Sequence, residues 1–342
     1  MTGDEVAPPS RVEAPPSPAE APPSPGERDP VLALVGPTAV GKTVLSLALA
    51  ARLRGEIISL DSRQVYRGMD VGTDKVTRED RERIPHHGLD LVDPDERYSA
   101  GRFGRDARRW IRQIRERGRL PLVVGGTGFF LKTLAEPVFR EPEMDPDRRE
   151  RLREWLARQS RLDLVRWVSL LDPERAAVAE AGGPQRLGRT LEVALLTGRP
   201  LSWWHRNAPP DAESVPVRVV LLERPREELY ERIEERTQAM FGSGLLEEVA
   251  ALLGAGYRTS DPGMTGTGYR EAAKVVQGEC SLEEAVLQVQ RATRAYARRQ
   301  LTWFRHQLPS EGLRIDARDP VDRQVEAVVR WWKAGTGVSG TG

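Results

Sequence analysis

The sequence VLALVGPTAVGKT, residues 31–43, decides the fold of this chain. Its first five residues are all apolar, which predicts a buried parallel strand over Val31–Val35. The remaining eight fit the phosphate-loop pattern GxxxxGK[ST], and a helix is expected to follow over 43–53. They are Gly36, Pro37, Thr38, Ala39, Val40, Gly41, Lys42 and Thr43. Because the loop N–H groups and the positive end of the helix face one point, we expect a diphosphate or triphosphate there. Lys42 would add a point charge, and Thr43 a hydroxyl ligand for Mg²⁺.

Further apolar runs alternate with helical stretches along most of the chain. Strands are predicted over residues 56–60, 89–92, 120–124, 217–222 and 313–316, and a last helix over 321–333. This alternation is typical of an α/β protein with a doubly wound parallel sheet.

Between residues 141 and 212 the strand signals vanish. Charged amphipathic helices are predicted over 146–159, 161–171 and 186–197, between the proline joints Glu141-Pro142 and Pro209-Pro210. We therefore expect a helical domain, residues 141–212, inserted into a discontinuous α/β core of residues 31–140 and 213–336.

The first thirty residues have a different character. The seven-residue units APPSRVE, APPSPAE and APPSPGE start at Ala7, Ala14 and Ala21. Paired prolines disfavour helix and leave nothing to bury, so residues 1–30 are predicted to be a disordered, polyproline-II-like arm. A passive arm is favoured over a ligand for a proline-binding partner.

The overall charge of +1 conceals an uneven distribution. Residues 1–30 hold six acidic and two basic side chains, a net charge of −4, so the rest of the chain carries +5. Arginines cluster in residues 102–119 and 291–306, and the second segment interleaves them with Tyr296, Trp303 and Phe304. That mixture suits phosphate contact with base stacking, although such aromatic residues more often pack into a core.

The single cysteine, Cys280, excludes a disulfide within the chain and a cysteine-based zinc site, and it indicates a cytosolic protein. The sequence has no apolar run of about 18 residues and no secretory signal, so no membrane partner is expected.

Two polar residues follow predicted strands, where α/β proteins collect their functional groups. Asp61 ends the strand over 56–60, and its side chain is either a functional carboxylate or a helix N-cap. Thr127 follows Gly125-Gly126 after the strand over 120–124, where an ATP-hydrolysing motor would carry a metal-binding acid.

Three other groups of residues carry side chains that could bind a metal or a phosphate. If the chain were an ATP-hydrolysing motor, only Asp61 or Glu223 could supply the metal-binding acid that is missing after the strand over 120–124. His86 and His87 are adjacent, so their rings diverge and a shared metal is not expected. Arg232 and Arg236 lie four apart on one face of a predicted helix, as either a solvated stripe or a clamp for phosphate oxygens.

The motifs together resemble one family, the tRNA dimethylallyltransferases, also called tRNA isopentenyltransferases. The matching segments are GPTAVGKT (36–43), DSRQVYRGMDVGT (61–73), PHHGLD (85–90), VVGGTGFF (123–130), PQRLGRTLEV (184–193), GLLEEV (244–249), GYRE (268–271) and ATRAYARRQLTWFR (292–305). They cover almost all of the chain from residue 31 to 305. The phosphate loop alone is generic, whereas the combination is specific.

The resemblance implies a P-loop NTPase-like core with an inserted helical domain. It also implies transfer of a dimethylallyl group from dimethylallyl diphosphate to N6 of the adenine 3′ of the anticodon, in tRNAs reading codons that begin with U. The phosphate loop would then hold the diphosphate rather than a nucleotide, with Mg²⁺ as cofactor. We expect a monomer, because each chain holds a complete set of motifs.

By the same resemblance, Asp61 is the base, Arg236 stabilises the leaving group, and Thr127 orients diphosphate or base. The tRNA contacts would be Asp61, Ser62, Arg63, Gln64, Thr127, Gln185, Arg186, Leu187, Gly188, Arg189, Thr265, Gly268, Tyr269, Arg270 and Arg298. The inserted domain and residues 291–305 would grip the anticodon stem-loop. The chain departs from the family pattern at Gly182-Gly183 and Thr265-Gly266-Thr267.

Three alternatives remain open at the level of sequence. A relative that prenylates free adenine nucleotides would share the phosphate loop and Asp61, but has little use for residues 141–212. A P-loop small-molecule kinase would leave the motifs PQR and ATR-YA-RQ unexplained. A nucleotide-dependent RNA-binding switch would need a second metal-binding acid.

Overall fold

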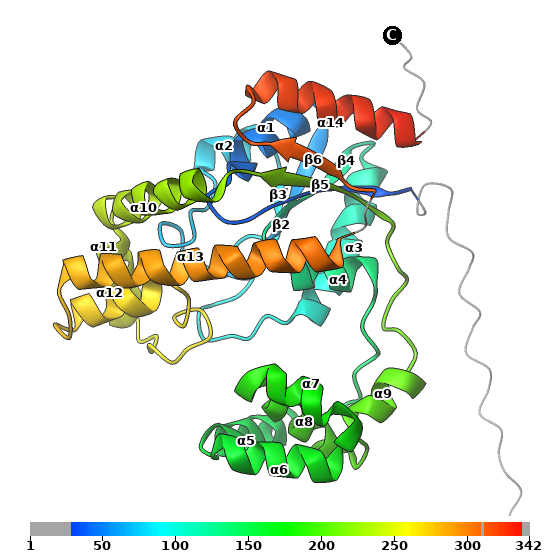
Figure 1. The fold of residues 1–342 in the computed structure, drawn as a ribbon, viewed down its shortest axis with the longest axis vertical. Helices are drawn as coiled ribbons and strands as arrows, with labels where there is room; N and C mark the ends of the chain where they lie inside the picture. Colours follow the sequence, from blue (N-terminus) through cyan, green and yellow to red (C-terminus); the bar gives the residue numbers. More distant parts are fainter. Residues whose placement is uncertain (1–28, 309–310, 337–342) are drawn as a thin grey trace, which may run out of the picture.

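The computed structural model describes residues 29–308 and 311–336 (Figure 1). Its six strands form one sheet in the order β3-β2-β4-β1-β5-β6, and every pair is parallel. The strands are β1 (Val31–Val35), β2 (Gly55–Leu60), β3 (His86–His87), β4 (Leu120–Gly125), β5 (Val217–Glu223) and β6 (Leu313–Asp316). The predicted parallel α/β sheet is confirmed.

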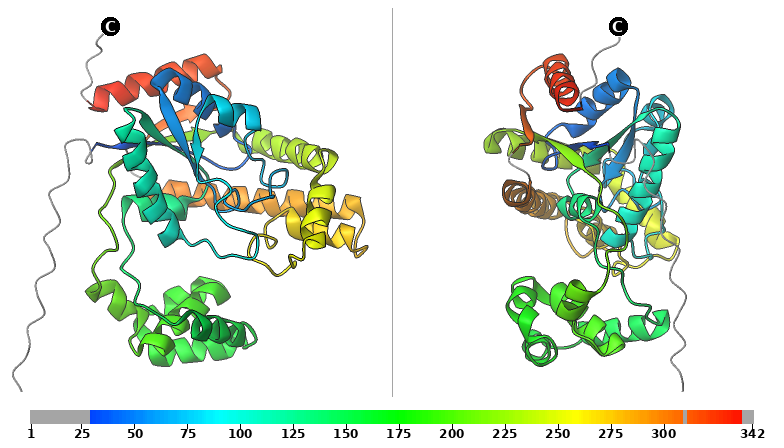
Figure 2. Two further views of the ribbon diagram at one scale, coloured as in Figure 1. Left: turned by 180° about the vertical axis from the view of Figure 1, so that it is seen from behind. Right: turned by 90° about the vertical axis from the view of Figure 1, so that its right-hand side faces the viewer.

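Strand β1 lies at the centre because it is apolar on both sides. Leu32 and Leu34 pack into one hydrophobic core, while Val31, Ala33 and Val35 pack into the other. The first core is covered by α1 (Lys42–Leu53), α10 (Arg226–Gly242) and α14 (Val321–Thr336), and the second by α3 (Ala100–Glu116) and α4 (Gly128–Ala135). Figures 1 and 2 show helices on both faces, as expected of a doubly wound sheet.

The remaining helices of the core build the rim around the strand ends. They are α2 (Arg78–Arg83), α11 (Leu245–Gly254), α12 (Tyr269–Val276) and α13 (Leu282–Gln307). Helix α13 is the long orange helix of Figure 1, and it crosses beneath the sheet toward α11 and α12. Within the described residues, no helix is long and apolar enough to cross a bilayer.

The predicted strand over 89–92 is wrong. The edge strand is His86–His87, which pairs with Ile57 and Ile58 of β2. It ends there because Gly88 and Asp90 adopt left-handed backbone conformations, with φ of 85° and 54°, which turn the chain away from the sheet. Only Val92 then forms an isolated bridge, with Tyr66. The predicted arm, residues 1–30, lies almost wholly outside the described residues.

Five helices form a separate group, here called the helical body, at a distance from the sheet (Figures 1 and 2). They are α5 (Pro146–Ala157), α6 (Arg161–Leu171), α7 (Ala176–Ala181), α8 (Gly183–Thr197) and α9 (Leu201–Asn207). Their apolar faces make a core of their own, centred on Leu164, Val168, Leu187 and Leu191. The helical body therefore has internal packing independent of the sheet.

A buried carboxylate also holds the helical body together. Glu192 of α8 is 2% exposed and accepts hydrogen bonds from Arg149, Arg153 and Arg189. Burial alone would raise the pKa of Glu192, but the hydrogen bonds from Arg153 and Arg149 hold that pKa below its usual value. The ion cluster thus joins α5 to α8 at one charged centre.

The two chain segments that lead to the helical body and back run side by side. The N–H of Arg140 donates to Pro209 O at 2.8 Å, that of Asp211 donates to Val138 O at 2.9 Å, and Phe139 bridges Pro210 in antiparallel fashion. Residues 138–140 and 209–211 thus form a short two-stranded neck, which contains the proline joint Pro209-Pro210 and directly precedes Glu141-Pro142.

Helix α3 anchors this neck to the core. Arg105 pairs with Asp211 at 3.0 Å. Arg108 donates to the carbonyl oxygens of Thr133, Leu134 and Glu213 at 2.7–3.0 Å. Part of the predicted basic segment 102–119 therefore serves the junction between core and helical body.

A glycine at the end of β4 sets how closely β2 and β4 approach. A Cβ on Gly125 would lie 2.2 Å from Leu60 O, a backbone atom that cannot move without breaking the sheet register. We expect Gly125→Ala to lower the free energy of unfolding by about 3 kcal/mol in urea denaturation. Gly188→Ala in α8 is the control, since nothing lies within 4 Å of its Cβ position, and it should stabilise by about 0.5–1 kcal/mol. Equal effects of the two substitutions would contradict this account.

Candidate active site

The carboxyl ends of β1, β2 and β4 meet at one edge of the sheet, and the phosphate loop lies there. Gly41, with φ of 110°, turns the loop into α1, which begins at Lys42. The Lys42 ammonium folds back over the loop and donates to Gly36 O at 3.0 Å and Pro37 O at 2.7 Å. The cation therefore lies inside the loop, where phosphate oxygens would bind.

The charge of Lys42 is sensitive to its surroundings. Burial and the neighbouring Arg236 guanidinium lower the pKa of Lys42 to about 8, against the opposing effect of Asp61 and Asp74. An arriving diphosphate would restore the charged form, because two or more negative charges would then face the ammonium.

Helix α10 lies over the first half of the loop. Arg232 donates to Ala39 O at 2.9 Å, and Arg236 donates to Thr38 Oγ1 at 2.8 Å. Arg236 also pairs with Asp74 at 3.3 Å. Both arginines thus contact the phosphate loop, which favours the clamp over the solvated stripe.

Asp61 follows β2 directly, in a turn rather than at the start of a helix. Its Oδ1 accepts the N–H of Arg63 at 2.7 Å. The helix N-cap interpretation is therefore wrong, and the residue remains a carboxylate at the strand end, lining the cavities described below.

Thr127 connects the ends of β2 and β4. Its N–H donates to Leu60 O at 3.1 Å, and its Oγ1 accepts the N–H of Ser62 at 3.2 Å. The Thr127 side chain also hydrogen-bonds Tyr296 of α13. The threonine thus fixes the residue that follows Asp61.

Two cavities share a wall at this edge of the sheet. The inner one, of about 110 Å³, contains the phosphate-loop residues Lys42 and Thr43 together with apolar side chains from Ile57 and Leu89. The outer one, of about 310 Å³, is lined by α10, by α13 and by Thr265 and Thr267. Both are lined by Thr38, Asp61, Thr73, Arg236 and Tyr296. A group bound in one cavity would therefore meet a group bound in the other beside Asp61.

Two residues of α13 were missed by the sequence analysis as site residues. Tyr296 lines both cavities, and burial followed by the charge of Asp61 raises its pKa to about 12. Gln300 lies one turn further along, contacting both the phosphate loop and Gly126. Their spacing of four within the motif 292–305 was the available signal, because it places them on one helix face.

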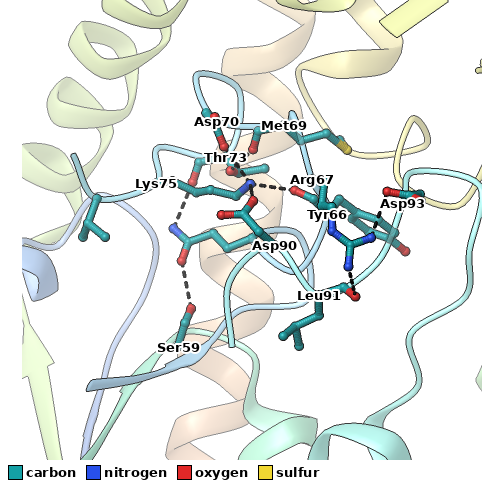
Figure 3. A network of polar contacts seen from close by, with 12 residues as sticks. Ser59, Tyr66, Arg67, Met69, Asp70, Thr73, Lys75, Asp90, Leu91 and Asp93 are labelled. Carbon is teal, nitrogen blue, oxygen red and sulfur yellow. Dashed lines mark hydrogen bonds and ion pairs between the residues drawn. The ribbon is translucent and has the colours of Figure 1, made fainter. Parts of the chain in front are cut away.

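A polar network holds the loop over 66–75 in place, and this loop contributes Thr73 to the wall shared by the two cavities (Figure 3). Lys75, whose side chain is 1% exposed, donates to Tyr66 O, Asp70 and Asp90 at 2.5–2.7 Å. Gln64 accepts from Ser59 and donates to the carbonyl oxygens of residues 73 and 74. The strand end and the loop over 66–75 are therefore held as one unit.

Helix α11 fixes the same loop from the other side. The Glu248 carboxylate accepts the N–H groups of Asp70, Val71 and Gly72 at 2.8–3.2 Å, together with the Tyr269 hydroxyl. A Cβ on Gly72 would lie 2.4 Å from the Tyr269 ring, so only glycine permits this contact. The motifs 61–73, 244–249 and 268–271 thus meet in one structural element.

Most of the predicted tRNA contacts fall into three places. Asp61, Ser62, Arg63 and Thr265 line the outer cavity, and Arg63 donates to Thr265 Oγ1 at 3.5 Å and Pro262 O at 2.8 Å. Gly268 and Arg270 lie at the start of α12, where Arg270 pairs with Glu271. Residues 185–189 lie on α8 in the helical body.

Not every side chain of that set is accessible. Leu187 is fully buried in the core of the helical body, and Tyr269 is 1% exposed against Glu248, so both side chains serve packing in this structure. Gln185 and Arg186 are exposed, whereas Arg189 pairs with Glu141 and Glu192. Arg298, on the exposed side of α13, lies 3.4 Å from the Tyr230 hydroxyl.

The two basic segments differ in how their charges are used. In the segment 102–119, Arg102 and Arg109 pair with Asp106, and Arg117 and Arg119 pair with Glu56. In the segment 291–306, the exposed arginines include Arg291, Arg298, Arg299 and Arg305. Of these four arginines, Arg299 lines the outer cavity.

The two histidines diverge as expected. His86 lines the inner cavity and contacts Ile84 O at 2.7 Å, and burial lowers its pKa. His87 contacts Glu56 at 2.8 Å.

The sequence model of the IPP transferase family matches residues 64–307. The chain belongs to this family. The resemblance found in the sequence, and the P-loop NTPase-like fold that it implied, are thereby confirmed.

Curated relatives agree along nearly the whole chain. A tRNA dimethylallyltransferase of Halorhodospira halophila is 43% identical over 302 residues, covering 88% of this chain and 97% of the relative. One from Desulfotalea psychrophila is 46% identical over 277 residues, covering 81% and 88%.

Solved structures of IPP transferases share the fold. The tRNA isopentenylpyrophosphate transferase of Bacillus halodurans is 35% identical, with a TM-score of 0.65 and coverage of 90% of this chain and 96% of that one. A eukaryotic dimethylallyltransferase acting on tRNA is 26% identical, with a TM-score of 0.74 and coverage of 88% and 77%.

The lowered pKa of Lys42 predicts a pH-dependent phosphate site. Affinity for inorganic diphosphate, measured by calorimetry without metal, should fall relative to Lys42→Arg as pH rises through about 8. Above that pH, binding must also protonate the neutral lysine, which lowers the apparent affinity, whereas the arginine is charged throughout and both proteins see the same ionisation of the ligand. A constant ratio of the two affinities from pH 7 to pH 9.5 would count against this assignment.

Proposed function

We propose that this chain is a tRNA dimethylallyltransferase. It would transfer the dimethylallyl group of dimethylallyl diphosphate to N6 of the adenine 3′ of the anticodon, in tRNAs reading codons that begin with U. The observation that carries the proposal is the shared wall of two cavities, one ending in a phosphate loop and the other opening beside basic residues, with Asp61 between them.

The two cavities suit the two substrates. The inner one combines Lys42 and the loop N–H groups with apolar walls from Ile57, Leu89 and Val124, as a short prenyl diphosphate requires. The outer one is wider and carries Arg63 and Arg299, which suit a nucleotide. An adenine must leave the anticodon stack to enter it, so the reaction includes base flipping.

The chemistry at the shared wall follows from the groups present. N6 of adenine is a poor nucleophile, since its lone pair is delocalised into the ring. As the N6–C1 bond forms and the C1–oxygen bond to diphosphate breaks, the N6 proton passes to the Asp61 carboxylate. The turn that uses Asp61 Oδ1 to hold the Arg63 N–H fixes the direction of this carboxylate.

The leaving diphosphate gathers negative charge during the transfer. Lys42 and Arg236 both contact the loop, line the inner cavity and supply positive charge, and the N-terminus of α1 adds its dipole. Thr127 is not among the residues that line the two cavities. It acts indirectly, through its hydrogen bonds with Ser62 and Tyr296, which do line them. We therefore assign Thr127 a role in orienting the shared wall.

Mg²⁺ is the cofactor that the residues fit. Within the described residues, no group of three or more His, Cys, Asp or Glu side chains forms a metal cage. The exposed Thr43 hydroxyl lines the inner cavity, and it suits an ion that takes its other ligands from diphosphate and water. When bound, the ion would neutralise charge on the leaving group.

We propose that three groups of residues bind the tRNA. They are the exposed arginines of α13, Gln185 and Arg186 of the helical body, and the residues around Thr265 at the outer cavity. The division into an α/β core and an inserted tRNA-binding domain over 141–212 is part of this proposal. So are a monomeric state and a cytoplasmic location.

The first test replaces the proposed base without disturbing its turn. Asp61→Asn keeps an oxygen that accepts the Arg63 N–H but removes the basic carboxylate. We expect single-turnover transfer to fall by about 10²–10⁴-fold, while tRNA affinity stays within about twofold. Loss of tRNA binding would instead make Asp61 a binding or structural residue.

The alternatives are separated by one assay with Mg²⁺, dimethylallyl diphosphate and either unmodified tRNA or AMP. Prenylated tRNA with unreacted AMP is expected. Prenylated AMP with untouched tRNA would make the chain an adenylate isopentenyltransferase. A parallel reaction in which ATP replaces dimethylallyl diphosphate tests the kinase, which would transfer a phosphoryl group from ATP.

The salt dependence of tRNA binding tests the basic surface. Replacing Arg298 and Arg299 by Gln should weaken binding and reduce the slope of log K against log salt by about 0.7–0.9 for each lost phosphate contact. Arg112→Gln, on the exposed side of α3, is the control and should leave the slope unchanged. A slope unaffected by the double substitution would remove α13 from the interface.

A further inference from the structure

The side chain of Gln300 joins two loops that are far apart in the sequence. Its Oε1 accepts the N–H of Thr38 in the phosphate loop at 2.9 Å, and its Nε2 donates to Gly126 O after β4 at 2.9 Å. The two bonds fix the orientation of the amide, because Thr38 N–H can only donate and Gly126 O can only accept. Gln300 itself is 6% exposed.

The close packing of α13 on the second loop makes this bridge possible. A Cβ on Gly126 would lie 2.2 Å from Gln300 Nε2, and one on Gly128 would lie 2.3 Å from the Trp303 ring. Gln300 and Trp303 are three apart and share a helix face. The absent side chains of Gly126 and Gly128 therefore let α13 approach until the Gln300 amide reaches both loops.

Thr38 is consequently held at two points by two different helices. Gln300 of α13 fixes its backbone N–H, and Arg236 of α10 fixes its hydroxyl at 2.8 Å. Thr38 also lines both cavities. A loop held in one shape binds its ligand without the entropic cost of ordering at that moment.

We propose that Gln300 is a positioning residue for the diphosphate substrate, which it serves by holding the phosphate loop at a fixed distance from the end of β4. This proposal rests on the proposed prenyl transfer for its kinetic readout. Gln300 does not touch the reacting atoms, and its effect passes through Thr38 and Gly126.

The test compares Gln300→Met with Gln290→Met. Methionine has nearly the same length as glutamine but makes neither hydrogen bond. Gln290 is a matched control, because it is also a buried glutamine of α13, at 8% exposure, and it lies away from the two loops. The measurements are KM for dimethylallyl diphosphate, KM for tRNA, calorimetric affinity for inorganic diphosphate, and Tm.

We expect Gln300→Met to raise KM for dimethylallyl diphosphate and to weaken inorganic diphosphate binding, each by about tenfold. KM for tRNA should stay within about twofold, and Gln290→Met should leave all three values near those of the wild type. An unchanged diphosphate affinity with a lower Tm would overturn the proposal, since Gln300 would then serve stability alone.

A second variant keeps the test decisive if Gln300→Met does not fold. Gln300→Glu retains an acceptor for the Thr38 N–H but loses the donor to Gly126 O and adds negative charge, so it should weaken diphosphate binding still further. Diphosphate affinity equal to that of the wild type would again overturn the proposal. A wild-type chain that binds diphosphate but transfers no prenyl group would contradict the proposed function only, and the calorimetry would still decide the role of Gln300.

Discussion

The parallel pairing of β1, β4 and β2 is the constraint on which the rest of the structure depends. Parallel strands end at the same edge of a sheet, so the phosphate loop, Asp61 and the glycine-rich segment after β4 are brought together. The pairing is close because Gly125 lacks a side chain opposite Leu60 O. The position of each functional group is thus determined by strands that are buried on both faces.

Long-range contacts from helices then convert this edge into a site. Helix α10 places two arginines on the phosphate loop, α13 joins that loop to Gly126, and α11 holds the loop over 70–72 through Glu248. Except for the bond from Arg236 to the Thr38 hydroxyl, these contacts involve backbone N–H and carbonyl groups, whose positions do not depend on side-chain rotamers. Backbone hydrogen bonding therefore gives the cavity walls their rigidity.

Contacts between distant segments also decide which arginines are paired with carboxylates. Glu56 and Glu192 are buried carboxylates that pair with two and three arginines, respectively, and so neutralise those cations. Arg291, Arg298, Arg299 and Arg305 of α13 are exposed, and Arg299 lines the outer cavity. Counting basic residues in the sequence could not separate the two groups, because pairing partners such as Asp211 and Glu56 lie 50 or more positions away from their arginines.

Most of the sheet was predictable because its strands are short apolar runs bounded by glycine, proline or acidic residues. The strand over 89–92 was mispredicted, since Gly88 and Asp90 turn the backbone where hydrophobicity alone favours extension. Asp61 was placed correctly at a strand end, but the choice between helix cap and free carboxylate needed the turn to Arg63. Gln300 went unnoticed as a site residue: its spacing of four from Tyr296 indicates a shared helix face, but not which loops that face contacts.

The sequence by itself determined the phosphate loop, the order of strands and helices, and the family, because each of these can be recognised from local patterns and motifs. Only the tertiary structure decided which arginines are available, which residues line both cavities, and which side chains of the family motifs are buried. Those properties arise from contacts between segments up to 262 residues apart, as between Thr38 and Gln300, and no local pattern encodes them.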